Sequence, residues 1–278
     1  KSFIDSHDDL KEKKIVLFSS LRDIENLHAK AKETGDLHYV IDNTFTSLNS
    51  SKCSEGVAAC VHNSLTAAYS RHQADSFTPY WQFSNADSSR LASRFDAETA
   101  NLLTFMQLTL PGALSLYYGQ ELGLPNVGEP PSPRGVMQWT PTGNDHHGFL
   151  SSADSNIGKL FFAESSNPTE QDNFETQYAQ ENSPLKVYQK LAKMRQRDEA
   201  LIVGSTVRDT VEGDVVIYSR FVKGENGTAI GSVLHSFDDL QVAAVTPGVA
   251  VYRARQKIDL TQEQISLPAK QAIMIKLP

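Results

Sequence analysis

The sequence predicts an α/β fold in two parts: half of a parallel (β/α)8 barrel over residues 1–200 and a small antiparallel β-sandwich domain over residues 201–278. Two observations support this division. In the first two-thirds, short apolar runs alternate with helical patterns, which is typical of βα units and a parallel sheet. From about Gly204, apolar runs follow one another with turn signals between them, which indicates antiparallel strands. A length of 278 residues fits one or two domains.

The predicted elements follow in order. Strands are expected at 14–18, 38–41, 80–83 and 113–118, and helices at 57–69, 91–110 and 183–197. A Pro- and Gly-rich excursion over 125–182 is too long for a simple connection, so we expect it to carry packing or function of its own. In the second part, strands are expected at 215–221, 229–234, 240–245, 249–253 and 272–277.

Four βα units make only half of such a barrel, and a half barrel has open sheet edges and an uncovered core. The chain also enters on a helical pattern that includes Phe3, Ile4 and Leu10 rather than on a strand. We therefore expect this chain to be the C-terminal portion of something larger, with an upstream half of the same barrel as its partner.

Composition and charge exclude several classes of protein. The formal net charge is −7, which argues against nucleic acid as a partner. No run approaches 18 apolar residues, so any membrane association is expected through a segment outside this chain. Glycine-rich nucleotide motifs and the Gly-x-Ser-x-Gly motif are absent from the sequence, and we expect no cofactor. His146 and His147 are adjacent without a third ligand, so we expect a solvated loop there and no metal.

Two further signals concern the compartment. Cys53 and Cys60 are seven residues apart, too far for a disulfide on one continuous helix, so pairing requires Cys53 in a loop before a helix that begins near Glu55. A disulfide and two free thiols both remain open. The sequons at Asn49 and Asn226 are candidate glycosylation sites. Together these signals favour an extracellular location.

Several linked motifs occur in the order found in glycoside hydrolase family 13, the α-amylase and α-glucosidase group. They are 85–94 (NADSSRLASR), 109–112 (TLPG), 118–124 (YGQELGL) and 136–139 (VMQW). The resemblance extends over about 14–205, and the β domain stands where that family has its C-terminal domain. It implies the second half of an amylase-like (β/α)8 barrel.

The family's active site uses a nucleophilic Asp after strand four, an acid/base Glu after strand five and a stabilising Asp after strand seven. Asp87 matches the stabilising Asp, whereas Ser19 and Ser20 occupy the place of the acid/base Glu. A hydroxyl is too weak a general acid near neutral pH. The resemblance places the nucleophile upstream of Lys1. We therefore expect no hydrolase activity, with Asp87 as a relic.

An amylase-like chain without its acid, beside extracellular signals, resembles the heavy chains of heteromeric amino-acid transporters, the 4F2 antigen and rBAT group. That resemblance implies a type II membrane glycoprotein on the extracellular face of the plasma membrane. It also implies a multi-spanning light chain as the partner, which the heavy chain stabilises and brings to the membrane. Two alternatives stay open: a fragment of an α-glucosidase-like enzyme, and a sugar-binding relic in which Trp81, Asp87 and Trp139 line a pocket.

Overall fold

The structure is a computed structural model. It describes residues 2–20, 37–75, 78–141, 147–149, 172–212, 215–221, 231–236, 240–243, 250–253, 264–267 and 270–276. The glycosylation candidate Asn226 and much of the excursion over 125–182 lie outside these residues.

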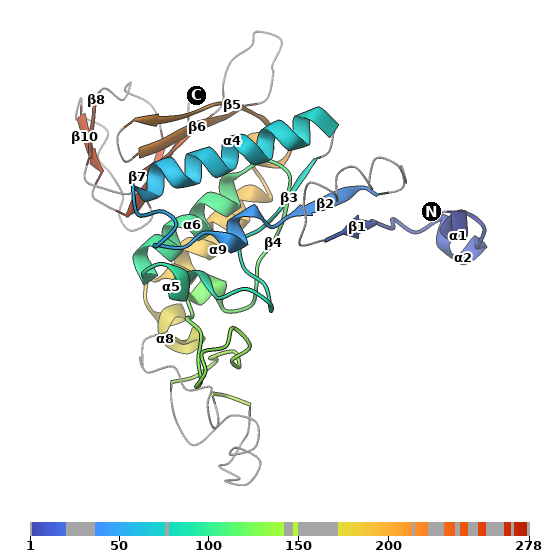
Figure 1. The fold of residues 1–278 in the computed structure, drawn as a ribbon, viewed down its shortest axis with the longest axis horizontal. Coiled ribbons are helices and arrows are strands. Elements are labelled where there is room, and N and C mark those ends of the chain that lie inside the picture. Colours follow the sequence, from blue (N-terminus) through green and yellow to red (C-terminus); the bar gives the residue numbers. More distant parts are fainter. Residues whose placement is uncertain are drawn as a thin grey trace.

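The first part is built on a parallel sheet (Figure 1). Its strands lie side by side in chain order: β1 (Phe18–Ser19), β2 (Tyr39–Asp42), β3 (Pro79–Gln82) and β4 (Ala113–Ser115). Helix α4 (Val57–Asp75) lies between β2 and β3 in the chain, and α5 (Leu91–Arg94) and α6 (Ala97–Thr109) lie between β3 and β4. The predicted α/β class and the parallel sheet are confirmed.

Several elements differ from the prediction: β4 ends at Ser115 rather than at 118, and α4 continues to Asp75. The first strand covers only Phe18–Ser19, because residues 14–17 have no strand partner among the described residues. The helix expected over 91–110 is two helices, because Phe95 and Asp96 are extended between them. The Asp96 carboxylate accepts a hydrogen bond from Thr99 N at 2.9 Å and so caps the N-terminus of α6. Aspartate is a preferred residue at this N-cap position.

One face of the parallel sheet packs on the helices. Val40, Asp42, Trp81 and Leu114 share this face by strand alternation and register, and Trp81 is fully buried. Trp81 and Leu114 pack with apolar residues of α4, including Leu65, in a continuous core. On the opposite face, the Tyr39 and Tyr80 rings meet edge to face with centroids 5.9 Å apart.

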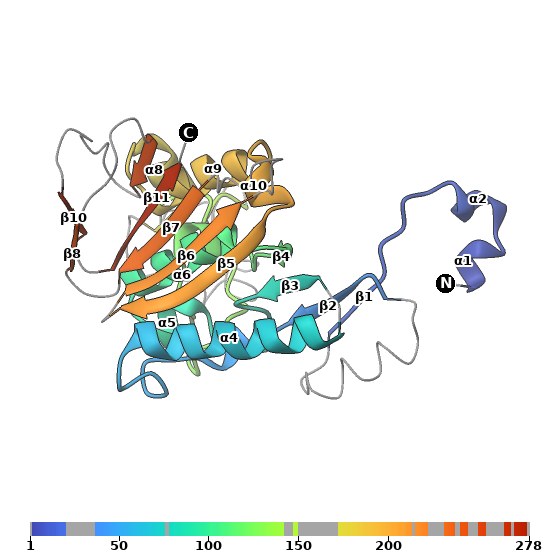
Figure 2. The same ribbon diagram turned by 90° about the horizontal axis from the view of Figure 1, so that it is seen from above.

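The second part is antiparallel, as predicted. Its main sheet has the order β5 (Ser205–Glu212), β6 (Val215–Phe221), β7 (Gly231–Ser236), β11 (Gln271–Lys276) and β9 (Ala250–Arg253), and it lies above α4 in Figure 2. A separate pair consists of β8 (Leu240–Ala243) and β10 (Gln264–Leu267). The sequence patterns did not indicate β5 or β10.

The antiparallel sheet and the α/β part share one hydrophobic core. Tyr218 of β6 and Met274 of β11 belong to the same buried cluster as Leu103 of α6. Between the two parts the chain passes through α8 (Phe174–Ala179), α9 (Pro184–Arg195) and α10 (Glu199–Ile202). Ser183 caps α9 through its side chain, with Pro184 at the first helical position, which suits proline because its missing N–H would have no partner there. The antiparallel sheet therefore packs directly against the helices of the α/β part.

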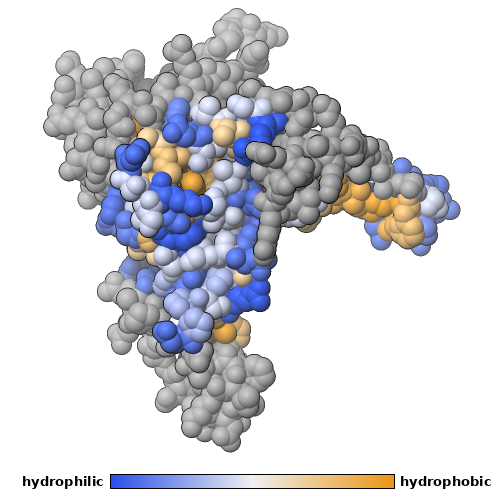
Figure 3. All heavy atoms as spheres, in the orientation of Figure 1, coloured by the Kyte–Doolittle hydropathy of each residue, from blue (hydrophilic) through white to orange (hydrophobic). Residues whose placement is uncertain are grey.

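The N-terminal segment extends away from this body. It carries α1 (Ser2–Asp5) and α2 (Asp8–Lys11), which stand apart from the sheets in Figure 2. Apolar residues gather along it in Figure 3. Phe3 and Phe18 of this segment are 65% and 54% exposed. Among the described residues, no helix combines the length and the apolar character needed to cross a membrane.

Candidate functional site

The carboxyl edge of the parallel sheet carries a hydrogen-bonded network between β3 and β4. Gln82 Nε2 donates to Ser115 Oγ at 3.1 Å, and Asn85 Nδ2 donates to Gln82 Oε1 at 3.0 Å. The Asn85 side chain also accepts from Asp87 N at 2.9 Å, the local turn that asparagine favours. This network positions the turn that presents Asp87.

Asp87 lies on the surface and forms an ion pair. Its Oδ1 is 2.8 Å from Arg134 Nη2, and the two side chains are 64% and 65% exposed. Arg134 Nε also donates to the carbonyl of Ala86 at 3.0 Å, so the arginine spans the turn. The carboxylate is thus held beside a cation from the excursion.

Arg90 joins the same edge to the excursion. Its Nε donates to Pro133 O at 2.9 Å, and its guanidinium lies 4.8 Å and 4.7 Å from the ring centroids of Tyr117 and Tyr118. Burial lowers the pKa of Arg90, although the two tyrosines oppose this. Burial and the hydrogen bond with Tyr118 raise the pKa of Tyr117 to about 12, so this phenol stays protonated at neutral pH.

Ser19 and Ser20 lie at the carboxyl end of β1. Ser19 is half-buried and Ser20 is exposed. Strand β2 separates them from β3, so they stand about 10 Å from the strand that leads to Asp87. Their hydroxyls can donate and accept hydrogen bonds but supply no general acid at neutral pH.

The tryptophans do not form the pocket that a sugar-binding relic would use. Trp81 faces the helices, where its indole donates to Pro111 O at 2.6 Å and its ring meets that of Tyr69 edge to face. The alternative in which Trp81 lines a pocket with Asp87 therefore has no support from Trp81, because that side chain is fully buried on the helix side of the sheet. Trp139 is 43% exposed and lies against Phe174, with ring centroids 5.7 Å apart.

The predicted solvated histidine loop also differs. His147 is 6% exposed, and its carbonyl accepts from Trp139 N at 3.2 Å, so this residue packs into the fold. His146 lies outside the described residues. Within the described ranges, His, Cys, Asp and Glu side chains form no group of three that could hold a metal ion.

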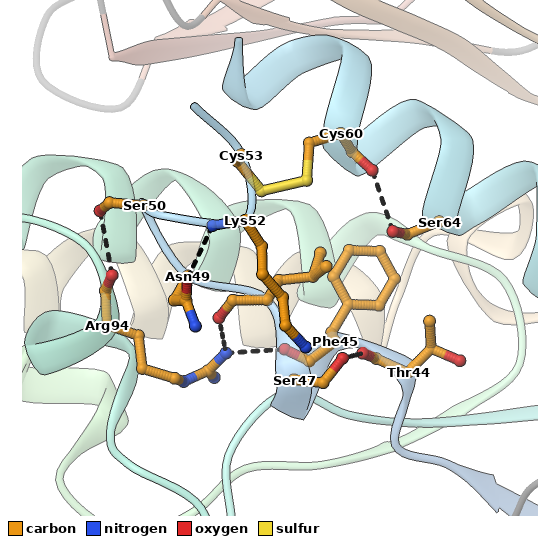
Figure 4. Close-up of a disulfide and its surroundings, with 11 residues drawn as sticks. Thr44, Phe45, Ser47, Asn49, Ser50, Lys52, Cys53, Cys60, Ser64 and Arg94 are labelled. Carbon is orange, nitrogen blue, oxygen red and sulfur yellow. Dashed lines mark hydrogen bonds between the residues drawn. A yellow bond between two sulfur atoms is a disulfide. The ribbon is translucent and has the colours of Figure 1, made fainter. Parts of the chain in front are cut away.

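A disulfide fastens the loop between β2 and α4 (Figure 4). It joins Cys53 and Cys60, whose Cα atoms are 5.4 Å apart. Cys53 lies in the turn before α4, the arrangement that pairing requires, and α4 begins at Val57 as predicted. Asn49 lies in the same loop, where its side-chain oxygen accepts from Lys52 N at 2.9 Å.

Arg94 holds this loop against β3. Its Nη1 donates to Phe45 O at 2.7 Å and also to Leu48 O, and its Nη2 donates to Phe83 O. Burial lowers the pKa of Arg94 to about 10, so the guanidinium is still charged at neutral pH. Phe45 lies in η1 (Thr44–Ser47), so one half-buried cation joins the segment after β2 to the segment after β3.

Sequence reasoning missed a buried charged cluster behind β2. Asp42 is fully buried, and its Oδ2 lies 2.9 Å from His72 Nε2 and 3.3 Å from Arg71 Nη2. Burial alone would raise the pKa of Asp42, but hydrogen bonds from His72 and Thr44 hold it below its ordinary value. The cluster faces α4 on the helix side, so its role is structural.

Comparison with protein families matches the catalytic domain of alpha-amylase to residues 17–204. The chain belongs to the alpha-amylase family. This match covers the parallel sheet, α4 to α10 and the carboxyl edge described above. The carboxyl ends of parallel barrel strands are where active sites of such folds lie.

Relatives of this alpha-amylase family chain include both transporter subunits and enzymes. It is 30% identical to the human amino acid transporter heavy chain SLC3A1 over 163 residues, 52% of this chain and 22% of that protein. It is 27% identical to maltase 1 of Drosophila virilis over 204 residues, 65% of this chain and 30% of that protein. The chain thus spans about a quarter of the length of the curated relatives that it matches.

A solved structure supports the fold. The crystal structure of alpha-amylase from H. orenii covers 99% of this chain, and the chain covers 55% of that protein, with a TM-score of 0.71 and 17% identity. At this identity the likeness shows the amylase-like fold alone.

Proposed function

We propose that this chain is part of the non-catalytic ectodomain of an amino-acid transporter heavy chain, which stabilises a multi-spanning light chain and brings it to the plasma membrane. The observation that carries the proposal is the pair Ser19 and Ser20 at the carboxyl end of β1. The family pattern has its acid/base glutamate there, and a hydroxyl cannot protonate a leaving glycosidic oxygen near neutral pH.

The surroundings of Asp87 support the same proposal. A stabilising carboxylate works beside a nucleophile and an acid, in a site from which water is excluded. Asp87 instead is largely exposed and paired with Arg134 at 2.8 Å. The disulfide between Cys53 and Cys60 supports an oxidising, extracellular environment. Similarity to the human heavy chain supports the choice of this class of partner.

We further propose that an upstream half of the barrel covers the open side of the parallel sheet. Beyond β1 the sheet has no further partner strand among the described residues, and Phe18 and Val16 are 54% and 53% exposed there. An apolar sheet edge of this kind needs a cover. We also propose that a domain boundary lies near residue 200 and that the two antiparallel sheets after it form a sandwich.

Two measurements on the full-length protein test the function. The first is hydrolysis of a chromogenic α-glucoside, with an active α-glucosidase as the positive control; we expect no turnover above a blank. The second is co-expression in cultured cells with each of a panel of multi-spanning light chains. We expect surface biotinylation of at least one light chain to rise with the full-length protein and to stay unchanged with an unrelated type II glycoprotein. Robust turnover, or no light chain raised, would overturn the proposal.

One observation favours the enzymatic alternative, a fragment of an α-glucosidase-like hydrolase. Asp87 and the network through Asn85 and Gln82 are retained at the carboxyl edge, and maltase 1 is among the relatives. That alternative predicts turnover of the α-glucoside that Asp87→Asn abolishes. The other alternative is a sugar-binding relic whose pocket does not include Trp81. It predicts that the protein binds glucosides without turnover.

A further inference from the structure

Helix α9 carries a line of cations along one side. Lys186, Lys190 and Lys193 lie within the helix, and Arg197 follows its end. Successive residues of a helix turn by about 100°, so the spacings of four, three and four residues place these cations within about 60° of one another. Arg197 keeps the spacing because its N–H donates to the Met194 carbonyl at 2.9 Å, which continues the helical turn. These four cations are called the α9 stripe below.

The α9 stripe faces solvent. Lys190, Lys193 and Arg197 are exposed, whereas Leu185 and Leu191 on the opposite side of the helix are buried in the core. In Figure 2, α9 lies on the side of the molecule opposite α4. The stripe is therefore a surface feature, separate from the carboxyl edge of the parallel sheet.

Acidic groups do not neutralise the stripe. Residues 184–197 contain five cations and no Asp or Glu, in a chain whose formal net charge is −7. The fifth cation, Arg195, turns inward and donates to carbonyls at the C-terminal end of α6 at 2.7 Å and 2.8 Å. Lys190, Lys193 and Arg197 form no ion pair with any residue that the structure describes. A local excess of positive charge of this kind attracts a polyanion.

The charge forms a line and not a broad patch. The neighbours of the stripe on α9 are neutral, with Gln189 and Gln196 on one side and Val187 on the other. Exposed acids, Glu181 and Glu199, stand beyond its two ends in the chain. At a rise of 1.5 Å per residue the stripe is about 16 Å long. This shape matches a linear polyanion better than a flat membrane surface.

Aromatic rings continue the stripe at its first cation. Lys186 Nζ lies 3.7 Å from the centroid of the Tyr178 ring, a cation–π contact that fixes this ammonium. Tyr178 stacks on Phe174 with centroids 5.4 Å apart, and Phe174 meets the ring of Trp139 at 5.7 Å. Tyr178 and Trp139 are 52% and 43% exposed. Sugar rings pack their C–H faces on aromatic rings, so this series favours a charged sugar chain over an acidic peptide.

We propose that the α9 stripe binds a sulfated polysaccharide, with sulfate groups on Lys190, Lys193 and Arg197 and a sugar ring against the aromatic series that ends at Trp139. Ionised acceptors form the stronger, charge-assisted hydrogen bonds with lysine and arginine. The choice of an extracellular polyanion rests on the location given under the proposed function. Binding in solution needs neither a light chain nor turnover, so the two proposals can fail separately.

The test is fluorescence anisotropy of a labelled heparin octasaccharide with the full-length protein at several salt concentrations. We expect saturable binding, with a slope of log affinity against log salt concentration near −3, the value for about four cations on a flexible polyanion. Unlabelled polyglutamate of matched charge and vesicles that contain phosphatidylserine should each compete at least tenfold less well than unlabelled heparin. Absent binding, or equal competition by either probe, would overturn the proposal.

Two paired variants locate the site. Lys190→Gln combined with Lys193→Gln removes two cations and keeps the helix, since glutamine and lysine have similar helix propensities. We expect heparin affinity to fall about tenfold and the salt slope to become less steep by about 1.4. Lys13→Gln combined with Lys14→Gln makes the same change in net charge at exposed positions of the N-terminal segment and should keep the affinity within about twofold. Unchanged affinity in the first pair, or equal losses in both pairs, contradicts the site.

Discussion

Arg220 of β6 donates a hydrogen bond from Nη1 to the carbonyl of Thr109, the last residue of α6, at 3.0 Å. Its Nη2 donates to the carbonyls of Ala200 and Gly204 at 2.9 Å and 2.6 Å. The last carbonyls of a helix lack partners within that helix. One buried arginine from the antiparallel sheet therefore completes the hydrogen bonding of two helix ends in the α/β part.

Replacing this arginine should destabilise the whole fold. Arg220→Met retains most of the apolar stem but leaves several buried carbonyls unpaired, so we expect a loss of about 3 kcal/mol in the free energy of unfolding. Urea denaturation followed by circular dichroism measures it. Arg134→Met, at a position 65% exposed, serves as the control and should change stability little. A similar small loss in both variants would contradict the structural role of Arg220.

The disulfide should stabilise the β2–α4 loop measurably. Replacing both Cys53 and Cys60 by serine should lower the free energy of unfolding by about 2 kcal/mol, the value expected for a loop this short. Dithiothreitol should lower the melting temperature of the native protein and leave that of the double variant unchanged. A melting temperature that dithiothreitol does not move would argue against the disulfide.

Asp42 should make stability depend on pH in the acid range. Hydrogen bonds from His72 and Thr44 outweigh the effect of burial and lower its folded pKa below the value of 3.8 for an unperturbed aspartate. Since the folded pKa is the lower one, this stabilisation is fully present above the unfolded pKa and is lost as pH falls through the folded pKa.

Asp42→Asn tests that dependence. The variant should be about 3 kcal/mol less stable at neutral pH, because it leaves buried partners without their carboxylate. The difference from the native protein should shrink below about pH 4. Urea midpoints at several pH values measure it, and a difference that stays constant down to the acid limit would count against the predicted pKa direction.

The ion pair of Asp87 with Arg134 should contribute little to stability. Both partners are about two-thirds exposed, so Asp87→Asn should change the free energy of unfolding by less than about 0.5 kcal/mol. Under the proposed function the variant also leaves α-glucoside hydrolysis at the level of the blank. A loss of measurable turnover would instead identify Asp87 as part of a working site.

Glycosylation at Asn49 is a prediction that mass spectrometry can check. The residue lies in the loop that the disulfide fastens, with its side-chain oxygen 2.9 Å from Lys52 N. In protein secreted from animal cells, Asn49→Gln should remove one glycan. The shift in electrophoretic mobility on treatment with peptide N-glycosidase should then be smaller than for the native protein. Asn226→Gln tests the second sequon in the same way. Unmodified asparagine at both positions would argue against the extracellular location.

Local patterns predicted the architecture well where burial is regular. The runs 38–41 and 80–83 lie close to β2 and β3, because strands covered by helices read as continuous apolar segments. The break at Asp96 was missed, since apolar residues continue on both sides and only the cap separates α5 from α6. β5 was missed because its sequence, STVRDTVE, is polar and mixed in charge.

The candidate site was predictable only as a set of positions. Asp87, Ser19 and Ser20 follow from motif order, but which face of β3 carries Trp81 depends on the register of the strand. The pairing of Asp87 with Arg134 joins residues distant in the sequence, and no local pattern encodes it.

Because the two parts share one hydrophobic core, the C-terminal sheet cannot be replaced independently of the helices that it packs against. A chimera that takes residues 205–276 from a relative would bring a foreign partner for Thr109 and a foreign surface against α4 and α6. We therefore expect a chimera joined near residue 204 to fold only if the contacting faces of α4 and α6 come from the same relative as the sheet. Differences between relatives at Tyr218, Met274 and Leu103 should accordingly occur as matched sets rather than singly.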